Sequence, residues 1–196
     1  MITKYHWNPY SDKNPIGFWS TRKQVTLRGV TWSDVPESLD SPMVQSLVGR
    51  NLLVECLRRQ GLFTGWPVYQ YGPHGKPQLE NYPDLFFNIS HCNRAVVCVV
   101  ADHEIGVDVE TITEIDKDAM QLVFNEREME LVLSHFNPTR AFARLWTKKE
   151  SLLKYLGIGI CDDIKDILNQ YDCEFWPRRG DDYEICVCLR AVPHSA

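Results

Sequence analysis

The spacing of apolar residues and of capping residues predicts three helices along the chain. Ser41-Pro42 is a typical helix start, a capping residue followed by proline in the first turn. Asn125 and Glu128 have the spacing of a capping box, and Asn137-Pro138 is another cap followed by proline. The expected helices therefore cover residues 41–60, 125–135 and 137–155.

Short apolar runs between the first two helices predict an antiparallel meander, with strands at 85–90, 95–101 and 105–110. The middle run is almost wholly apolar, so we expect it to be buried on both faces. Another strand is expected at 183–192. Because strands and helices do not alternate as βα units, this order favours an α+β fold with antiparallel sheets.

Composition and charge narrow the class of protein. The chain has 196 residues, is 44% hydrophobic and carries a formal net charge of −5, which argues against a nucleic-acid-coating protein. It has no apolar run long enough for a membrane helix and no secretory signal near its start. Seven cysteines without a CxxC pair suggest free thiols in a reducing compartment. We therefore expect a cytoplasmic protein without a membrane or nucleic-acid partner.

The third strand of the meander carries two carboxylates on one face. Ile105, Val107 and Val109 alternate with Asp108 and Glu110, so the acidic pair points away from the core. Neighbouring carboxylates repel unless a cation lies between them, and Mg²⁺ prefers such oxygen ligands. From spacing alone, a solvated acidic strand edge is the commoner explanation.

The last helix presents a second candidate group. Trp146, Glu150 and Lys154 follow one another at intervals of four residues and share one helix face. Glu150 and Lys154 could form only a surface ion pair, but a tryptophan on the same face suggests that this face is partly buried.

Two further groups of residues could bind an anion, although their sequence patterns are less specific. Ser90-His91 ends a strand at a tight turn, where a hydroxyl, an imidazole and backbone N–H groups could converge on a phosphate. A hydrogen-bonded structural histidine is an equal alternative. Lys76 stands between Gly75 and Pro77 in a loop, and by itself is an ordinary turn residue. No Walker A or G-x-G-x-x-G sequence is present.

Taken in order, residues 75–77, 87–91, 106–110 and 146–154 resemble the signature motifs of the 4′-phosphopantetheinyl transferase superfamily. The resemblance is closest to the surfactin-synthetase-activating type, a single chain of two similar halves. It implies two α+β halves packed as a pseudo-dimer, here 1–104 and 105–196, with the active site in the crevice between them.

The resemblance also implies an activity, the transfer of phosphopantetheine from coenzyme A to a serine of an acyl or peptidyl carrier protein by a monomeric enzyme. The other product is adenosine 3′,5′-bisphosphate, and the carrier would serve fatty acid, polyketide or nonribosomal peptide biosynthesis. The implied roles are metal binding for Asp108, Glu110 and Glu150, catalysis for Glu150 and Lys154, and coenzyme A binding for Lys76, Ser90, His91 and Arg50.

Two other functions fit the same residues. An Asp-x-Glu pair with a helical Glu and Lys could build a magnesium-dependent phosphodiesterase or nuclease, although the acidic net charge opposes this. A non-catalytic module that binds coenzyme A or a carrier protein is the other alternative, but such a module has no need for a general base and metal ligands.

Overall fold

The computed structural model describes residues 5–7, 27–34, 41–72, 75–159 and 163–194. Its larger sheet is antiparallel and contains, in spatial order, β1 (Tyr5–Trp7), β2 (Leu27–Asp34), β6 (Ala95–Ala101) and β5 (Phe86–His91). A second antiparallel sheet contains β7 (Gly106–Thr111), β9 (Tyr183–Pro193) and β8 (Tyr171–Arg179). A separate hairpin pairs β3 (Tyr69–Tyr71) with β4 (Pro77–Leu79). The helices are α1 (Pro42–Arg59), α2 (Lys117–Val123), α3 (Glu126–Leu133), α4 (Pro138–Leu156) and the 3-10 helix η2 (Ile164–Asn169).

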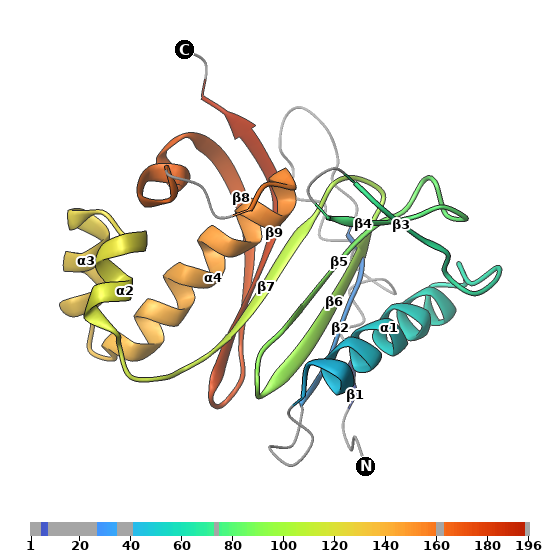
Figure 1. Cartoon of the computed structure of the whole chain (residues 1–196), viewed down its shortest axis with the longest axis horizontal. Helices are drawn as coiled ribbons and strands as arrows, with labels where there is room; N and C mark the ends of the chain where they lie inside the picture. The colour runs from blue at the N-terminus through green and yellow to red at the C-terminus, as the bar shows by residue number, and fades with distance from the viewer. Residues whose placement is uncertain (1–4, 8–26, 35–40, 73–74, 160–162, 195–196) are drawn as a thin grey trace.

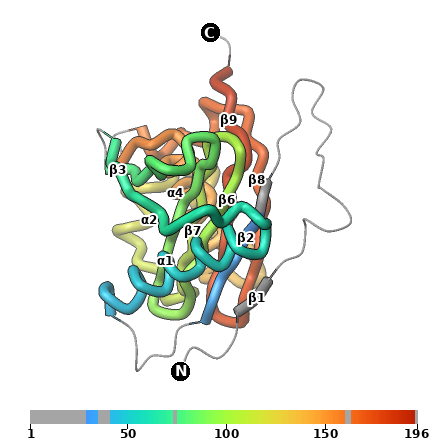
Figure 2. Tube along the Cα trace, turned by 90° about the vertical axis from the view of Figure 1, so that its right-hand side faces the viewer, coloured from blue at the N-terminus to red at the C-terminus, as the bar shows by residue number. Residues whose placement is uncertain are grey.

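The elements are stacked in layers, and the fold is α+β as expected (Figure 1). Apolar side chains of β2 and β6 share one core with those of β7, β8 and β9, so the two sheets pack against each other. α1 covers the other face of the larger sheet, and in Figure 2, seen from its side, α1 lies in front of the strands. α4 contacts β7 and β9 on the far side of the smaller sheet. In the described part of the chain, no helix is long and apolar enough to span a bilayer.

Side-chain caps start the three predicted helices where the sequence placed them. Ser41 and Asn137 each accept a hydrogen bond from a backbone N–H in the first turn of α1 and α4, and both helices have proline in that turn. The capping box of Asn125 and Glu128 is present at the start of α3. α4 ends at Gly157, whose φ of 70° lies in the left-handed region. These helix predictions are confirmed.

The predicted meander is partly wrong. β5 and β6 form the expected hairpin, and every residue of β6 is buried. The third strand, β7, leaves this sheet and pairs instead with β9. A strand pattern fixes which faces are apolar and does not name the partner strand, so β7 could satisfy its pattern in either sheet.

Side chains of β5 meet the edge of β7 that faces away from β9. Asn88 Oδ1 accepts a hydrogen bond from the N–H of Val107 at 2.9 Å, and Ser90 Oγ accepts one from the N–H of Val109 at 3.3 Å. The unpaired backbone groups of an edge strand need partners, and here side chains two residues apart on β5 provide them. This pair of contacts joins the two sheets.

On the face that carries the carboxylates, β7 touches the backbone of α4. A Cβ atom on Gly106 would lie 2.0 Å from the carbonyl oxygen of Ser151 and 2.4 Å from the backbone nitrogen of Tyr155. No side chain fits in that space, so glycine at this position allows α4 to approach the strand that carries the carboxylates.

We expect Gly106→Ala to lower the free energy of unfolding by about 3 kcal/mol, because a methyl group would press α4 away from β7. Gly65→Ala is the matched control, since a Cβ at Gly65 meets no atom within 4 Å. Urea unfolding followed by circular dichroism measures both. Equal stability of the two variants would contradict this close packing.

Candidate active site

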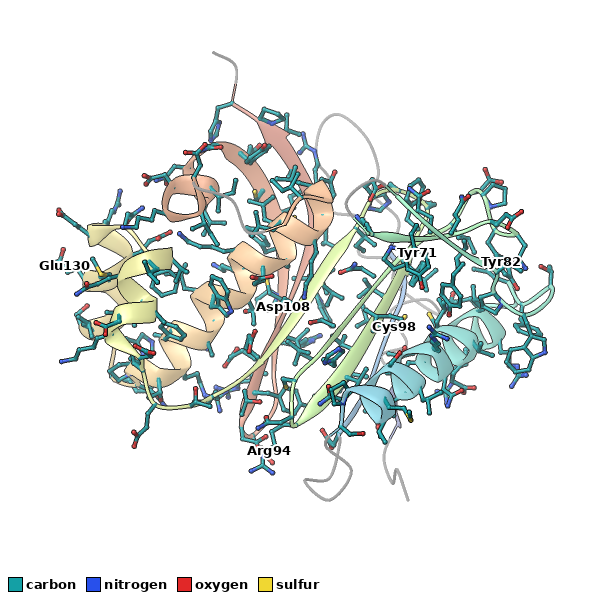
Figure 3. The ribbon with its side chains drawn as sticks, in the orientation of Figure 1. Tyr71, Tyr82, Arg94, Cys98, Asp108 and Glu130 are labelled. Atoms are coloured by element: carbon teal, nitrogen blue, oxygen red, sulfur yellow. The ribbon has the colours of Figure 1, made fainter. Side chains whose placement is uncertain are left out.

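Asp108 lies at the centre of the candidate site, between β7 and α4 (Figure 3). Val107 and Val109 belong to the core between the sheets, so Asp108 points to the opposite face, as the alternation predicted. The residue is only 2% exposed. A solvated acidic edge therefore does not describe Asp108.

Asp108 Oδ1 is held by a lysine and a hydroxyl. Lys154 Nζ lies 2.6 Å from it, and Ser90 Oγ donates a hydrogen bond to it at 2.8 Å. Lys154 Nζ also donates to Ser90 Oγ at 2.9 Å, which closes a triangle of contacts. The second oxygen, Asp108 Oδ2, is buried and has no hydrogen-bond partner among the described residues.

Glu110 lies farther along the same face of β7. Its Oε1 accepts a hydrogen bond from Trp146 Nε1 of α4 at 3.2 Å. Burial, and then the charge of Asp108, raise the pKa of Glu110 from 4.5 to about 7, although Trp146 and Lys154 oppose this shift. Near neutral pH, both the protonated and the ionised form of this carboxyl are therefore populated.

Glu150 completes the acidic group from the side of α4. Burial and the charge of Asp108 raise its pKa, whereas Lys154 lowers it, and Glu150 in turn contributes to the raised pKa of Glu110. The helix face predicted to carry Trp146, Glu150 and Lys154 is thus turned toward the carboxylates of β7. Three carboxylates from two elements influence one another here.

The donor set fits a hard divalent cation, because it offers carboxylate oxygens and includes the unpartnered Asp108 Oδ2. The distances between these side chains, however, do not yet suit a bound ion. Within the described residues, no three His, Cys, Asp or Glu side chains lie close enough together to hold a metal ion as arranged. In this arrangement, the ammonium of Lys154 contacts Asp108 Oδ1 and places a positive charge beside the free Oδ2.

Lys76 is not held out in a loop as the sequence suggested. Its Nζ contacts Glu104 Oε2 at 2.6 Å and donates to the carbonyl oxygens of Ile105 and Tyr155 at 3.3 and 3.2 Å. Lys76 thus joins the linker before β7 to the last turn of α4, where a cation also interacts favourably with the helix dipole. It lines a pocket of about 190 Å³ together with residues of β4 and β5.

His91 and Arg50 lie apart from the carboxylates. His91 pairs with Val96, which packs against α1, whereas Ser90 pairs with Val97 on the opposite face of the sheet. Arg50, on the exposed side of α1, lies over the ring of Tyr69 at 5.3 Å. The structure therefore brings Ser90 to the carboxylates but not His91 or Arg50.

Lys149 is a residue that the sequence analysis missed. It is fully buried, pairs with Glu128 at 2.7 Å, and donates to three backbone carbonyl oxygens at the end of α2 and the start of η2. Burial lowers its pKa, although Glu128 opposes the shift. Lys149 thereby fixes α4 against α2, α3 and η2, one residue before Glu150. Its place between two other charged residues gave no sign of burial.

Comparison with known proteins identifies the family. The model of the 4′-phosphopantetheinyl transferase superfamily matches residues 104–193. The 4′-phosphopantetheinyl transferase AcpT of Salmonella typhi is 33% identical over 157 residues, which cover 72% of this chain and 74% of the relative. The chain belongs to the 4′-phosphopantetheinyl transferase superfamily.

Two further members of the superfamily are similar over part of their length. The 4′-phosphopantetheinyl transferase gsp of Aneurinibacillus migulanus is 34% identical over 119 residues, which cover 57% of this chain and 49% of the relative. A 4′-phosphopantetheinyl transferase of Bacillus subtilis is 37% identical over 119 residues, 59% of this chain and 53% of the relative. The chain thus spans about half the length of these two relatives. The comparisons give no support to the nuclease or to the non-catalytic module.

We expect Glu110→Gln to stabilise the protein at pH 8 and to have little effect at pH 5. The folded state keeps a proton on Glu110 up to about pH 7, whereas the unfolded chain loses it near the ordinary pKa. Wild-type stability therefore falls as the pH rises through this window, and a neutral glutamine that still accepts from Trp146 avoids the loss. Thermal unfolding at both pH values, with EDTA present, measures the difference.

The control for this prediction is Glu130→Gln, because Glu130 is exposed on α3, far from Asp108 in Figure 3. Its melting temperature should differ from that of the wild type by the same small amount at both pH values. A Glu110→Gln difference that does not grow with pH would show that Glu110 ionises normally.

Proposed function

We propose that the protein transfers 4′-phosphopantetheine from coenzyme A to a serine hydroxyl of an acyl or peptidyl carrier protein and releases adenosine 3′,5′-bisphosphate. The observation that carries this proposal is the group of Asp108, Glu110, Glu150 and Lys154 in a chain of this superfamily. The carrier would belong to fatty acid, polyketide or nonribosomal peptide biosynthesis.

In this proposal, the halves 1–104 and 105–196 form a pseudo-dimer with the active site in the crevice between them. The enzyme in this proposal is a monomer. The described cysteines are all free thiols, in keeping with a cytoplasmic location, and Cys161 lies outside the described residues.

Asp108, Glu110 and Glu150 would hold Mg²⁺. When bound, the ion would supply neutralising charge for the diphosphate of coenzyme A. Asp108 offers its unpartnered Oδ2, while Glu110, whose pKa is raised to about 7, must first lose the proton that it partly retains near neutral pH. We therefore expect proton release when the cation binds.

Glu150 is the proposed general base. Its raised pKa makes it a better proton acceptor than an ordinary exposed carboxylate, and it would take the proton of the serine hydroxyl directly or through water. Lys154 has a side chain that is 30% exposed, so its ammonium can turn toward a phosphate. There it would stabilise charge on the phosphoryl group or the leaving bisphosphate.

Lys76, Ser90, His91 and Arg50 are the proposed contacts of coenzyme A. Ser90 is nearest to the carboxylates, and Lys76 lies beside the last turn of α4 and lines a pocket. Arg50 belongs to α1, and His91 lies on the face of the larger sheet that α1 covers. Both would therefore reach a part of coenzyme A remote from the reacting phosphate.

The direct test incubates the protein with coenzyme A, Mg²⁺ and a panel of apo carrier proteins. We expect intact-protein mass spectrometry to show the addition of one phosphopantetheine arm to at least one carrier, with equimolar adenosine 3′,5′-bisphosphate. Coenzyme A binding without any carrier modification would refute the proposed reaction.

We expect Glu150→Gln to reduce the transfer rate by about 10²–10⁴-fold, the usual contribution of a general base. Glu130→Gln removes the same charge from an exposed position of α3 and should leave the rate unchanged. Circular dichroism should show both variants folded. Turnover of Glu150→Gln at the wild-type rate would exclude Glu150 as the base.

A further inference from the structure

The ammonium of Lys154 contacts two groups beside the carboxylates of the candidate site. It lies 2.6 Å from Asp108 Oδ1 and 2.9 Å from Ser90 Oγ, and the Ser90 hydroxyl donates to the same carboxylate oxygen. Ser90 is itself anchored, because it accepts the N–H of Val109 on β7. Lys154 is therefore held against Asp108 by a fixed hydroxyl.

We propose that Lys154 is an internal counter-ion that competes with the divalent cation for Asp108, and that Ser90 is the positioning residue that holds it there. Binding of a diphosphate would draw Lys154 from Asp108, and binding of a cation would release Lys154 for a phosphate. This inference rests on the proposed function for the identity of the diphosphate, which is that of coenzyme A.

Burial explains why Asp108 needs a counter-ion. Its side chain is 3% exposed, and a buried carboxylate without a partner is strongly unfavourable. Asp108 raises the pKa of both Glu110 and Glu150, so these neighbours repel it when ionised and offer no positive charge. Lys154 is the cation seen in contact with Asp108, so removal of that contact leaves a site that attracts a divalent ion more strongly.

Exposure explains why Lys154 can leave. Its side chain is ten times more exposed than that of Asp108, at 30% against 3%, and its flexible stem can carry the ammonium outward. Lys76 is in a different position, since it is held by Glu104 and by two backbone carbonyl oxygens. Lys154 is thus the movable partner of a fixed carboxylate.

The consequence is a thermodynamic coupling. If the cation and the diphosphate each displace the Lys154–Asp108 contact, each ligand raises the affinity of the other by the same factor. Removal of the ammonium should abolish this part of the coupling. Removal of the ammonium should also raise the affinity for the metal in the absence of coenzyme A. A purely structural role of Lys154 does not predict this increase.

The experiment titrates Mn²⁺ into the whole folded protein by calorimetry, first without coenzyme A and then with it. Lys154→Met is compared with Lys148→Met, which removes the same charge from the same helix at a side chain that contacts Phe175. Lys154→Arg retains the charge, and Ser90→Ala removes the hydroxyl. Thermal unfolding checks that each variant folds.

Without coenzyme A, we expect Lys154→Met to bind Mn²⁺ about tenfold more tightly than the wild type, and Lys148→Met to stay within about twofold. Lys154→Arg should resemble the wild type, and Ser90→Ala should bind Mn²⁺ about threefold more tightly, because the ammonium is held less firmly. Coenzyme A should tighten Mn²⁺ binding less in Lys154→Met than in the wild type.

Equal affinities of the two methionine variants, or unchanged or weaker binding by Lys154→Met, would overturn the inference. Weaker Mn²⁺ binding by Ser90→Ala would show that Ser90 does not position Lys154. Carrier modification by the wild type is measured on the same preparation, so that failure of this inference can be told from failure of the proposed transfer reaction. An active wild type without the Lys154 effect defeats this inference alone, and an inactive wild type with the effect defeats the proposed transfer alone.

Discussion

The joint between the two sheets determines where the site can be. The outer edge of β7 has backbone N–H groups that need partners, and Asn88 and Ser90 supply side-chain oxygens in place of a neighbouring strand. Ser90 therefore belongs both to the joint and to the contacts of Asp108 and Lys154. Because α4 packs at Gly106 on the same face of β7 that carries the carboxylates, these side chains lie in a space bounded by both sheets and a helix. Burial there raises the pKa values of Glu110 and Glu150, a local cost typical of functional sites.

Local periodicity was enough to predict half of the site. A strand has a period of two, so the sequence alone places Asp108 and Glu110 on one face, opposite the valines that enter the core. A helix has a period near 3.6, so Glu150 and Lys154 must share a face. The caps that start α1, α3 and α4 are equally local, because each involves a side chain and an N–H within one turn.

Contacts between distant segments could not be predicted in this way. β7 joins β9 rather than β6 because of packing across the whole domain, and Lys149 is buried because carbonyl oxygens of two remote segments surround it. β8 has few buried residues and includes Pro177, so its sequence does not read as a strand. The opposite directions of Ser90 and His91 are different, since the alternation of a strand already implied them.

The pairing of β7 has a consequence for synthesis on the ribosome. The described strands of the larger sheet and α1 have all emerged once β6 has been made, so they can fold before the rest of the chain is synthesised. β7 follows at once, yet its ladder partner β9 is the last strand that the structure describes. Throughout the translation of α2, α3, α4 and β8, the nascent chain holds Asp108 and Glu110 on a strand without its final neighbour. A ribosome-bound intermediate would thus contain a finished amino-terminal layer and no assembled catalytic centre.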